Sequence, residues 1–524
     1  MSDPIKTILF ISVMILCVIG AVLSLPSLGE LEEGDPTGQT LFPEFTDPLA
    51  VASVSITKYD GENVTHLKTR LEKGMWRISS HGNYPADALQ QVSEAATLLS
   101  GMKILGLAGS ESGRQGEYGV VDPTQKNLGL GIKGVGTRVV LKDGKGTTLA
   151  DLIIGKPDPH TPDLCYVRRT GEPMILTVKM KDNTFTTKFS DWAKKNPLDI
   201  NILALRKITF DDYRWYADHK APFREGRMLV QYDPKSEEGK WKLENAWLFM
   251  DGRFPNEFQP GQGQSLDAEF LDRMKATLEN LTIVDVACKS PELSKMFEGG
   301  VLPLKKWKEF QNQKKPSRSS QKEYKRYEEV KKVYKAIGEI YKGMEQFGFH
   351  ITKNTPDAVP LYGEGGQVSV LLDEGVKYTL RFGNIVPRNR MVAGENPKGS
   401  PKDKSTKIPA KDRYLLITVD FDQEGIAPPD LEDLPALPME GTSIPISESQ
   451  IKEIKAARER IERENEWKKQ EYEAKVTAGK KRAEEINARF AGWYYVIPED
   501  VYKKLHLSID KFFKDSNQVK VKQP

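Results

Sequence analysis

An uninterrupted apolar run near the amino terminus places the strongest constraint on this chain. Thr7–Leu25 holds 19 residues without a charged side chain. At about 1.5 Å of rise per residue, such a helix nearly spans the hydrocarbon core of a bilayer. Lys6 precedes the run and acidic residues such as Glu30 follow it. Because positive charge stays on the cytoplasmic side, we expect residues 1–6 in the cytoplasm, a single transmembrane helix at 7–25, and the carboxy-terminal bulk outside the cytoplasm.

A cleaved signal peptide is the alternative interpretation of the same run. The run is long for a signal peptide, and no A-x-A cleavage site follows it. Both interpretations export the rest of the chain, and whether the helix is cleaved stays open. Residues 26–48 are rich in glycine and proline and are predicted to be a linker.

The composition excludes several classes of protein. A net charge of +3 gives no overall bias toward nucleic acid, so no nucleic-acid partner is expected. The 3 cysteines and 6 histidines are scattered, which makes neither a disulfide scaffold nor a zinc site. Whether Cys165 and Cys288 form a disulfide stays open, because spacing alone does not decide it.

Two regions of the chain share an order of features. Met102–Ala108 (MKILGLA) aligns with Leu281–Ala287 (LTIVDVA), each after an amphipathic helical stretch. The first helical stretch, 86–102, carries Leu89 and Val92 on its apolar face. Strand-like alternation precedes and follows each helix, and a closing helix is expected at 185–193 in the first region and at 498–513 in the second. We therefore predict an α+β fold with two tandem degenerate strand–helix–strand repeats, over 49–204 and 205–524. Other paired features, in the same order, are Trp76 with Trp241, Gly119 with Gly348, and Gly155 with Gly383.

Two insertions distinguish the second unit. The first, near 290–344, is basic and has one apolar helical face, which predicts a helix docked on the domain; a contact with anionic lipid or an acidic partner is the alternative. The second, near 422–489, begins with a proline-rich stretch and continues as a densely charged helix from Gln450 to about Phe490. A helix with so little apolar surface either projects into solvent or binds a partner.

No sequence motif for catalysis is present. The chain has no P-loop, no G-x-S-x-G and no H-E-x-x-H string. The glycines at 129, 131 and 134 precede a strand-like run, whereas a dinucleotide fingerprint needs a helix there. Adjacent carboxylates such as Asp211 and Asp212 are interpreted as solvated turn residues. We therefore predict no catalytic, cofactor-binding or metal-binding residues, no cofactor, and a protein that is not an enzyme.

Several short motifs resemble a known family. Trp76–Ile78 (WRI), Pro85–Asp87 (PAD), Glu117–Pro123 (EYGVVDP) and Leu152–Gly155 (LIIG), together with the strand at Ile175–Val178, resemble the domain-of-unknown-function 4340 family. The resemblance covers roughly residues 50–200 well. It implies a bacterial membrane-anchored, exported domain, of a kind often encoded with ABC-type transport and gliding-motility-like components. For such a protein, the helix at 7–25 would lie in the inner (cytoplasmic) membrane and the carboxy-terminal bulk in the periplasm. It implies no catalytic residues.

These observations lead to three functional hypotheses. The first is a non-enzymatic, membrane-anchored accessory or scaffold protein, associated with subunits of an ABC-type transport complex of the cell envelope. The second is an exported ligand-binding module for an envelope polysaccharide or peptide, with its site in a cleft between the two units. The third is a hydrolase whose site assembles only on folding.

Overall fold

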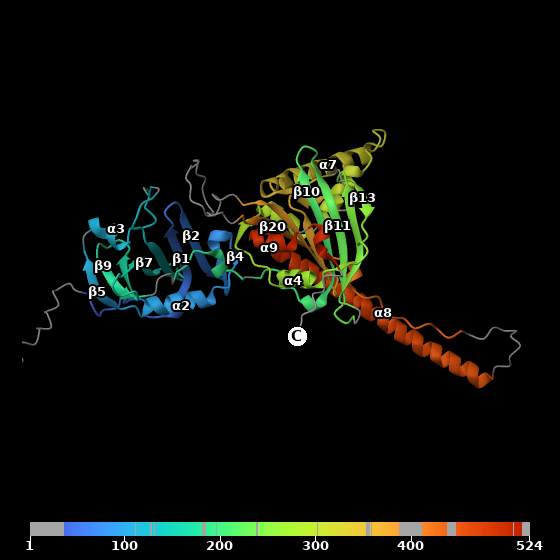
Figure 1. Ribbon diagram of the computed structural model, residues 1–524, viewed down its shortest axis with the longest axis horizontal. Helices are drawn as coiled ribbons and strands as arrows, with labels where there is room; N and C mark the ends of the chain where they lie inside the picture. Colours follow the sequence, from blue (N-terminus) through green and yellow to red (C-terminus); the bar gives the residue numbers. More distant parts are fainter. Residues whose placement is uncertain are drawn as a thin grey trace, which may run out of the picture. The chain divides into compact units, whose positions relative to one another are not determined.

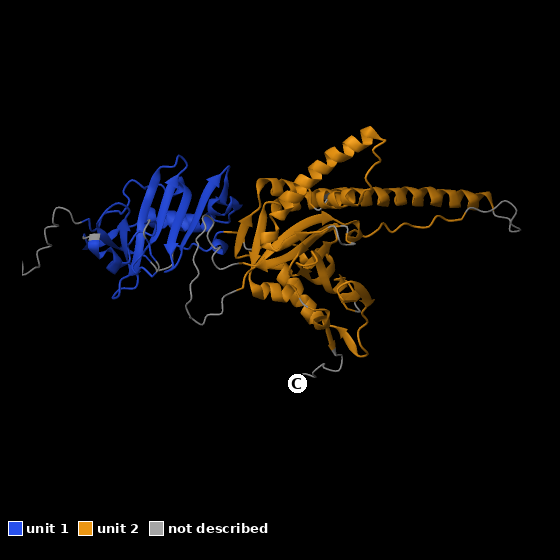
Figure 2. Ribbon diagram, turned by 90° about the horizontal axis from the view of Figure 1, so that it is seen from above, with its two compact units in different colours: residues 1–192 blue, residues 193–524 orange. Residues whose placement is uncertain are grey.

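A computed structural model describes residues 36–515, except 111, 126–127, 130, 181–184, 195, 237–238, 301, 353–356, 358, 387–410, 437–446 and 507. The chain divides into two compact units, Met1–Trp192 and Ala193–Pro524, coloured separately in Figure 2. The predicted transmembrane helix at 7–25 lies outside the described residues. None of the helices within the described ranges is long and apolar enough to cross a membrane.

Unit 1 is built on one nine-stranded sheet in which every neighbouring pair is antiparallel. Its spatial order is β4-β3-β2-β1-β6-β7-β8-β9-β5. Hairpin turns connect most neighbours; at Asp60 the side chain accepts hydrogen bonds from the amides of Glu62 and Asn63, which closes the β1–β2 turn. The strands are β1 (Val51–Tyr59), β2 (Val64–Glu72), β3 (Met75–Ile78), β4 (Tyr84–Pro85), β5 (Ile104–Gly109), β6 (Thr137–Asp143), β7 (Thr148–Pro157), β8 (Leu164–Arg169) and β9 (Ile175–Lys179).

Unit 2 contains a second nine-stranded antiparallel sheet, in the order β13-β12-β11-β10-β18-β19-β20-β21-β15. Along the chain, its strands occupy the sheet in the same relative order as those of unit 1. The strands are β10 (Leu205–Tyr216), β11 (Ala221–Tyr232), β12 (Trp241–Met250), β13 (Phe254–Glu257), β15 (Asp285–Cys288), β18 (Gln367–Leu372), β19 (Val376–Ile385), β20 (Arg413–Phe421) and β21 (Trp493–Ile497). Two small two-stranded sheets pair β14 (Gln264–Leu266) with β22 (Phe513–Asp515) and β16 (Phe349–Ile351) with β17 (Leu361–Gly363).

Few helices accompany the sheet of unit 1. Helix α2 (Leu89–Ser100) lies along one face of the sheet (Figure 1) and buries Val92, Ala95, Ala96 and Leu99. Leu89 begins the helix and is 67% exposed, although the sequence pattern placed it on the apolar face. The other α-helix described in this unit is α3 (Gln115–Tyr118).

Unit 2 carries more helix, mostly in the two predicted insertions. The first insertion forms α5 (Pro291–Glu298), α6 (Leu302–Asn312) and α7 (Gln321–Lys342). The second forms α8 (Glu448–Phe490), whose carboxy-terminal end packs on the sheet through Ala483, Ile486 and Phe490. The rest of α8 extends away from the sheet as an arm (Figure 1). Two further helices are α4 (Ala268–Glu279) and α9 (Glu499–Leu505).

The predicted α+β class is wrong: both units are organised by large antiparallel sheets, with helices as additions. The strand–helix–strand description gave the closing helices too much weight. In unit 1 the helix expected at 185–193 is a single 3-10 turn at Phe189–Asp191. In unit 2 the helix expected at 498–513 ends at Leu505. Hairpins connect most strands. The alternation of apolar and polar residues in the sequence therefore reflects strands of two continuous sheets, and not strand–helix–strand layers.

The structure describes the end of the expected linker and the two cysteines outside the apolar run. The end of the expected linker packs on unit 1, because Leu41 and Phe45 are buried and the amide of Leu41 donates to the carbonyl of Met102. Cys165 is buried in unit 1, where its thiol donates to the carbonyl of Met180 at 3.2 Å, and Cys288 is exposed in unit 2; neither forms a disulfide.

Candidate functional site

One face of the unit 2 sheet carries a row of hydroxyl side chains across four adjacent strands. Thr209 on β10 pairs with Ser369 on β18, Ser369 with Thr379 on β19, and Thr379 with Thr418 on β20. Directly paired residues project from the same side of a sheet. The four hydroxyls therefore form one row, and those of Ser369 and Thr379 are 3.2 Å apart.

A second polar row lies two residues along the same strands. Arg227 on β11 pairs with Asp211 on β10, Asp211 with Gln367 on β18, and Gln367 with Arg381 on β19. Since side chains alternate between faces, both rows face the same way. The intervening residues, such as Phe210, Val368 and Leu380, are buried apolar side chains on the opposite face.

These rows form the floor of a cavity of about 600 Å³, which lies within the size range of small-molecule sites. Its walls include Lys305 on α6, Lys480 on α8 and the end of β20. Further lining residues are Asp357, Val359, Leu361 and Tyr362. Every lining residue belongs to unit 2. We refer to it as the unit 2 cavity.

Arg381 is the most buried charged group of the floor, with only 4% of the residue exposed. Its Nε donates to the carbonyl of Leu361 at 3.0 Å, and its Nη1 donates to the Thr418 hydroxyl at 2.8 Å. No carboxylate among the described residues lies within ion-pair distance of this guanidinium. Burial lowers the pKa of Arg381, because desolvation disfavours the charged form.

Asp211 lies in the same row as Arg381, with Gln367 between them, and is also buried. One oxygen accepts a hydrogen bond from Gln367 Nε2 at 3.0 Å, and the other lies 3.5 Å from Arg227 Nε. The interpretation of Asp211 and Asp212 as solvated turn residues is therefore wrong: both lie within β10 and are buried. Asp212 projects to the other face, where His506 Nε2 is 3.2 Å from its carboxylate.

The remaining carboxylates of the cavity each have a cation beside them. Asp357 forms an ion pair with Arg224 and accepts a hydrogen bond of 2.6 Å from the Tyr362 hydroxyl. Burial raises the pKa of Asp357, but these two partners outweigh it and the pKa is lowered. At the rim, Lys305 is 3.0 Å from Asp420, and Lys377 is 2.8 Å from Asp422.

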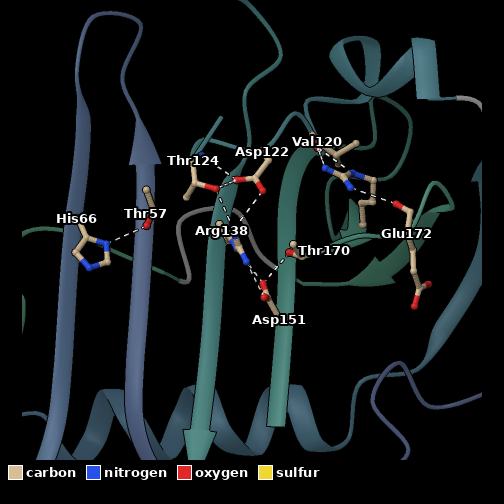
Figure 3. A network of polar contacts seen from close by, with 10 residues as sticks. Thr57, His66, Val120, Asp122, Thr124, Arg138, Asp151, Thr170 and Glu172 are labelled. Atoms are coloured by element: carbon tan, nitrogen blue, oxygen red, sulfur yellow. Dashed lines mark hydrogen bonds and ion pairs between the residues drawn. The ribbon is translucent and has the colours of Figure 1, made fainter. Parts of the chain in front are cut away.

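A network of polar contacts around Arg138 in unit 1 provides a comparison, because this arginine is paired with carboxylates (Figure 3). Arg138 donates two hydrogen bonds to Asp151, of 3.0 and 2.8 Å. It donates a third of 3.2 Å to Asp122 and a fourth of 2.9 Å to the Thr124 hydroxyl. Two carboxylates thus balance one guanidinium, and this network is best explained as a contribution to the packing of unit 1.

The side chains of the unit 2 cavity are suited to hydrogen bonding with a polar ligand. The described residues of its lining include neither histidine nor cysteine. The hydroxyls of Ser369 and Thr379 bond to each other, and the Thr418 hydroxyl accepts from Arg381. Within the described ranges, no group of three or more histidine, cysteine or acidic residues is placed to hold a metal ion. The cavity offers hydroxyls, an amide, carboxylates and cations, a combination typical of a site for a polar ligand.

The sequence analysis did not find this site. The sequence does show polar residues that alternate with core residues within a strand, such as Thr209 and Asp211 on either side of Phe210. That signal places polar residues on one face of each strand, but it does not say which strands are neighbours.

The fold and the cavity define the chain as a protein of two antiparallel β units, one of them with a polar binding cavity. Residues 76–296 match the model of a family described as Domain of unknown function (DUF4340). The match supports the family assignment that the sequence motifs indicated. Among curated proteins and among solved structures, nothing matches the chain. Of the cavity residues, only Thr209, Asp211 and Arg227 lie within the matched segment.

Proposed function

We propose that this chain is a non-enzymatic ligand-binding protein of the cell envelope, exported and anchored to the inner membrane through residues 7–25, which binds a polar ligand in the unit 2 cavity. One observation carries the proposal: two rows of polar side chains, one ending in a buried guanidinium, form the floor of a cavity of about 600 Å³. Burying polar groups costs free energy unless they are hydrogen-bonded, so such a floor is explained more readily by a ligand than by packing.

The test is a thermal-unfolding screen of the full chain in mild detergent against fragments of envelope polysaccharide and peptide. We expect at least one fraction to raise the melting temperature, because a ligand that binds only the folded state stabilises it. Ser369→Phe, which places a ring on the cavity floor, should abolish that shift. Ser319→Phe, at an exposed position between α6 and α7, is the matched control and should retain it. A screen without any stabilising fraction, or a shift that survives Ser369→Phe, contradicts the proposal.

A second candidate function rests on the arm formed by α8. We propose that the arm binds a protein partner, which makes the chain an accessory or scaffold subunit of an ABC-type transport complex. The segment before α8 runs along the helix: Asn465 Nδ2 donates to the carbonyl of Glu432 at 2.8 Å, and the amide of Glu432 donates to Asn465 Oδ1 at 2.9 Å. Trp467, two residues further along α8, is 62% exposed. A large aromatic side chain in the open is common at binding hot spots.

The contacts of the arm define a deletion that spares the domain. Removing 425–490 would also remove Ile426 and the buried end of α8, and would unfold unit 2. Replacing 433–464 by Gly-Gly joins two segments that already bond to each other, and it leaves Asn465 as a good helix N-cap.

Crosslinked affinity purification from native membranes then tests the second candidate. We expect the full chain to recover transporter subunits and the 433–464 replacement to lose them. Trp467→Ala should reduce recovery, whereas Met250→Ala, on β12 and 58% exposed, should not. Equal recovery by the full chain and the replacement would exclude the arm as the contact.

A further inference from the structure

We propose that the ligand of the unit 2 cavity is an acidic saccharide, with its carboxylate bound to Arg381 and its hydroxyls bound along the row from Thr209 to Thr418. This inference rests on the proposed ligand-binding function and names the chemical class of the ligand. It follows from the charges of the cavity, the burial of Arg381 and the register of the four hydroxyls.

The charges of the cavity leave an excess of positive charge. Each of its four carboxylates has its own cation, and the pairs are Asp211 with Arg227, Asp357 with Arg224, Asp420 with Lys305, and Asp422 with Lys377. Two lining cations remain, Arg381 and Lys480, and neither has a carboxylate within ion-pair distance in the described part of the chain. Lys480 lies over the ring of Phe421, 5.6 Å from its centre.

Arg381 is the cation most in need of a partner. A guanidinium has more N–H donors than the two that Leu361 and Thr418 accept, and its Nη2 makes no hydrogen bond to a described residue. The charges of Asp211 and Asp357 favour the charged form of Arg381, but each of these carboxylates already faces another arginine. A buried charge is retained at low cost only when it is paired. A planar carboxylate matches the fork of a guanidinium and would supply the missing partner.

The hydroxyl row indicates what the rest of the ligand is. Neighbouring strands lie about 4.8 Å apart, so Thr209, Ser369, Thr379 and Thr418 present hydroxyls at regular intervals beside Arg381. A hydroxyl both donates and accepts a hydrogen bond, and this suits the hydroxyls of a sugar ring. An acidic peptide would place side chains and amides there instead. A phosphate group would place a compact dianion against Arg381 alone, because the other floor guanidinium, that of Arg227, already faces Asp211.

Isothermal titration of the full chain in mild detergent tests the inference, with digalacturonate as the probe. Cellobiose is the neutral saccharide control, acetate tests the charge alone, and a Glu-Glu dipeptide tests the acidic peptide. We expect digalacturonate to bind more tightly than any of the three. Arg381→Gln should weaken digalacturonate binding by about tenfold or more, as expected for the loss of a charged hydrogen bond. Thr379→Val removes one hydroxyl at nearly constant volume, and should weaken digalacturonate but not acetate.

Arg168→Gln is the matched control. Arg168 is also buried and bonded to main-chain carbonyls, of Val120 and Glu172, but it lies in unit 1 outside the cavity. It should leave digalacturonate affinity unchanged, and thermal unfolding of each variant separates lost binding from lost folding. Equal binding of cellobiose and digalacturonate, or preferred binding of Glu-Glu, would overturn the saccharide class while preserving ligand binding. Failure of every probe, together with a negative fragment screen, would overturn both.

Discussion

Replacing Asn487 by alanine is expected to lower the free energy of unfolding of unit 2 by about 3 kcal/mol or more, at roughly 1–3 kcal/mol for each buried group left without a partner. Asn487 lies on α8 and is only 2% exposed. Its side-chain Oδ1 accepts a hydrogen bond from the Val419 amide at 3.0 Å, and its Nδ2 donates to the carbonyls of Phe297 and Glu298. One side chain thus joins α8, β20 and the end of α5. Its loss removes the partner of the Val419 amide and of the Glu298 carbonyl, whereas the Phe297 carbonyl keeps the amide of Gly300.

Denaturant unfolding followed by circular dichroism measures the effect, and Asn465→Ala provides the control. Asn465 lies on the same helix and forms a similar pair of main-chain hydrogen bonds, but to the exposed residue Glu432. Water replaces those bonds when the side chain is removed, so we expect a loss of about 0.5 kcal/mol. Similar losses for the two variants would show that Asn487 does not hold α8 to the sheet.

Two glycines within helices are expected to respond to alanine with opposite signs. At Gly479 of α8, a Cβ atom would lie 2.2 Å from the carbonyl oxygen of Glu374 and 2.9 Å from the ring of Phe421. The helix would have to move away from the β18–β19 turn, and we expect Gly479→Ala to destabilise unit 2 by about 2 kcal/mol, within the usual cost of overpacking. This exceeds the gain of about 1 kcal/mol that alanine brings to a helix interior.

Gly338 of α7 is the matched case, in which the higher helix propensity of alanine should outweigh any steric cost. A Cβ atom there has only Trp307 Nε1 nearby, at 4.0 Å. We expect Gly338→Ala to stabilise the protein by about 0.5–1 kcal/mol, because glycine loses more backbone entropy on folding than alanine. Thermal and denaturant unfolding measure both variants. A stabilising Gly479→Ala would mean that α8 does not approach the turn as closely as described.

Much of the local structure was predictable because it depends on residues close together in the chain. Alternation from Val51 onward predicted β1, and apolar spacing predicted the helices that form α2 and α4. The charged stretch after Ser447 predicted α8, whose capping box joins Ser447 and Gln450. Short motifs around Trp76 and Glu117 indicated the family that residues 76–296 match.

The α+β class was wrong because strand patterns do not specify how strands pair. The run at 185–193 has apolar residues compatible with a helix, yet it folds as a short turn beside the sheet. The expected cleft between the units likewise depends on long-range placement that no local pattern carries. The membrane helix at 7–25 and the association with a transport complex stay predictions.

The sequence by itself determined the alternation of each strand, the capping box of α8 and the dense charge of that helix, because these depend on side chains a few residues apart. Only the tertiary structure decided that Thr209, Ser369, Thr379 and Thr418 share a row, and that Arg381 and Asp211 share a second row. Thr209 and Thr418 are 209 positions apart in the chain. Their meeting depends on strand order and register, because a slip of one residue would turn every polar side chain to the apolar face.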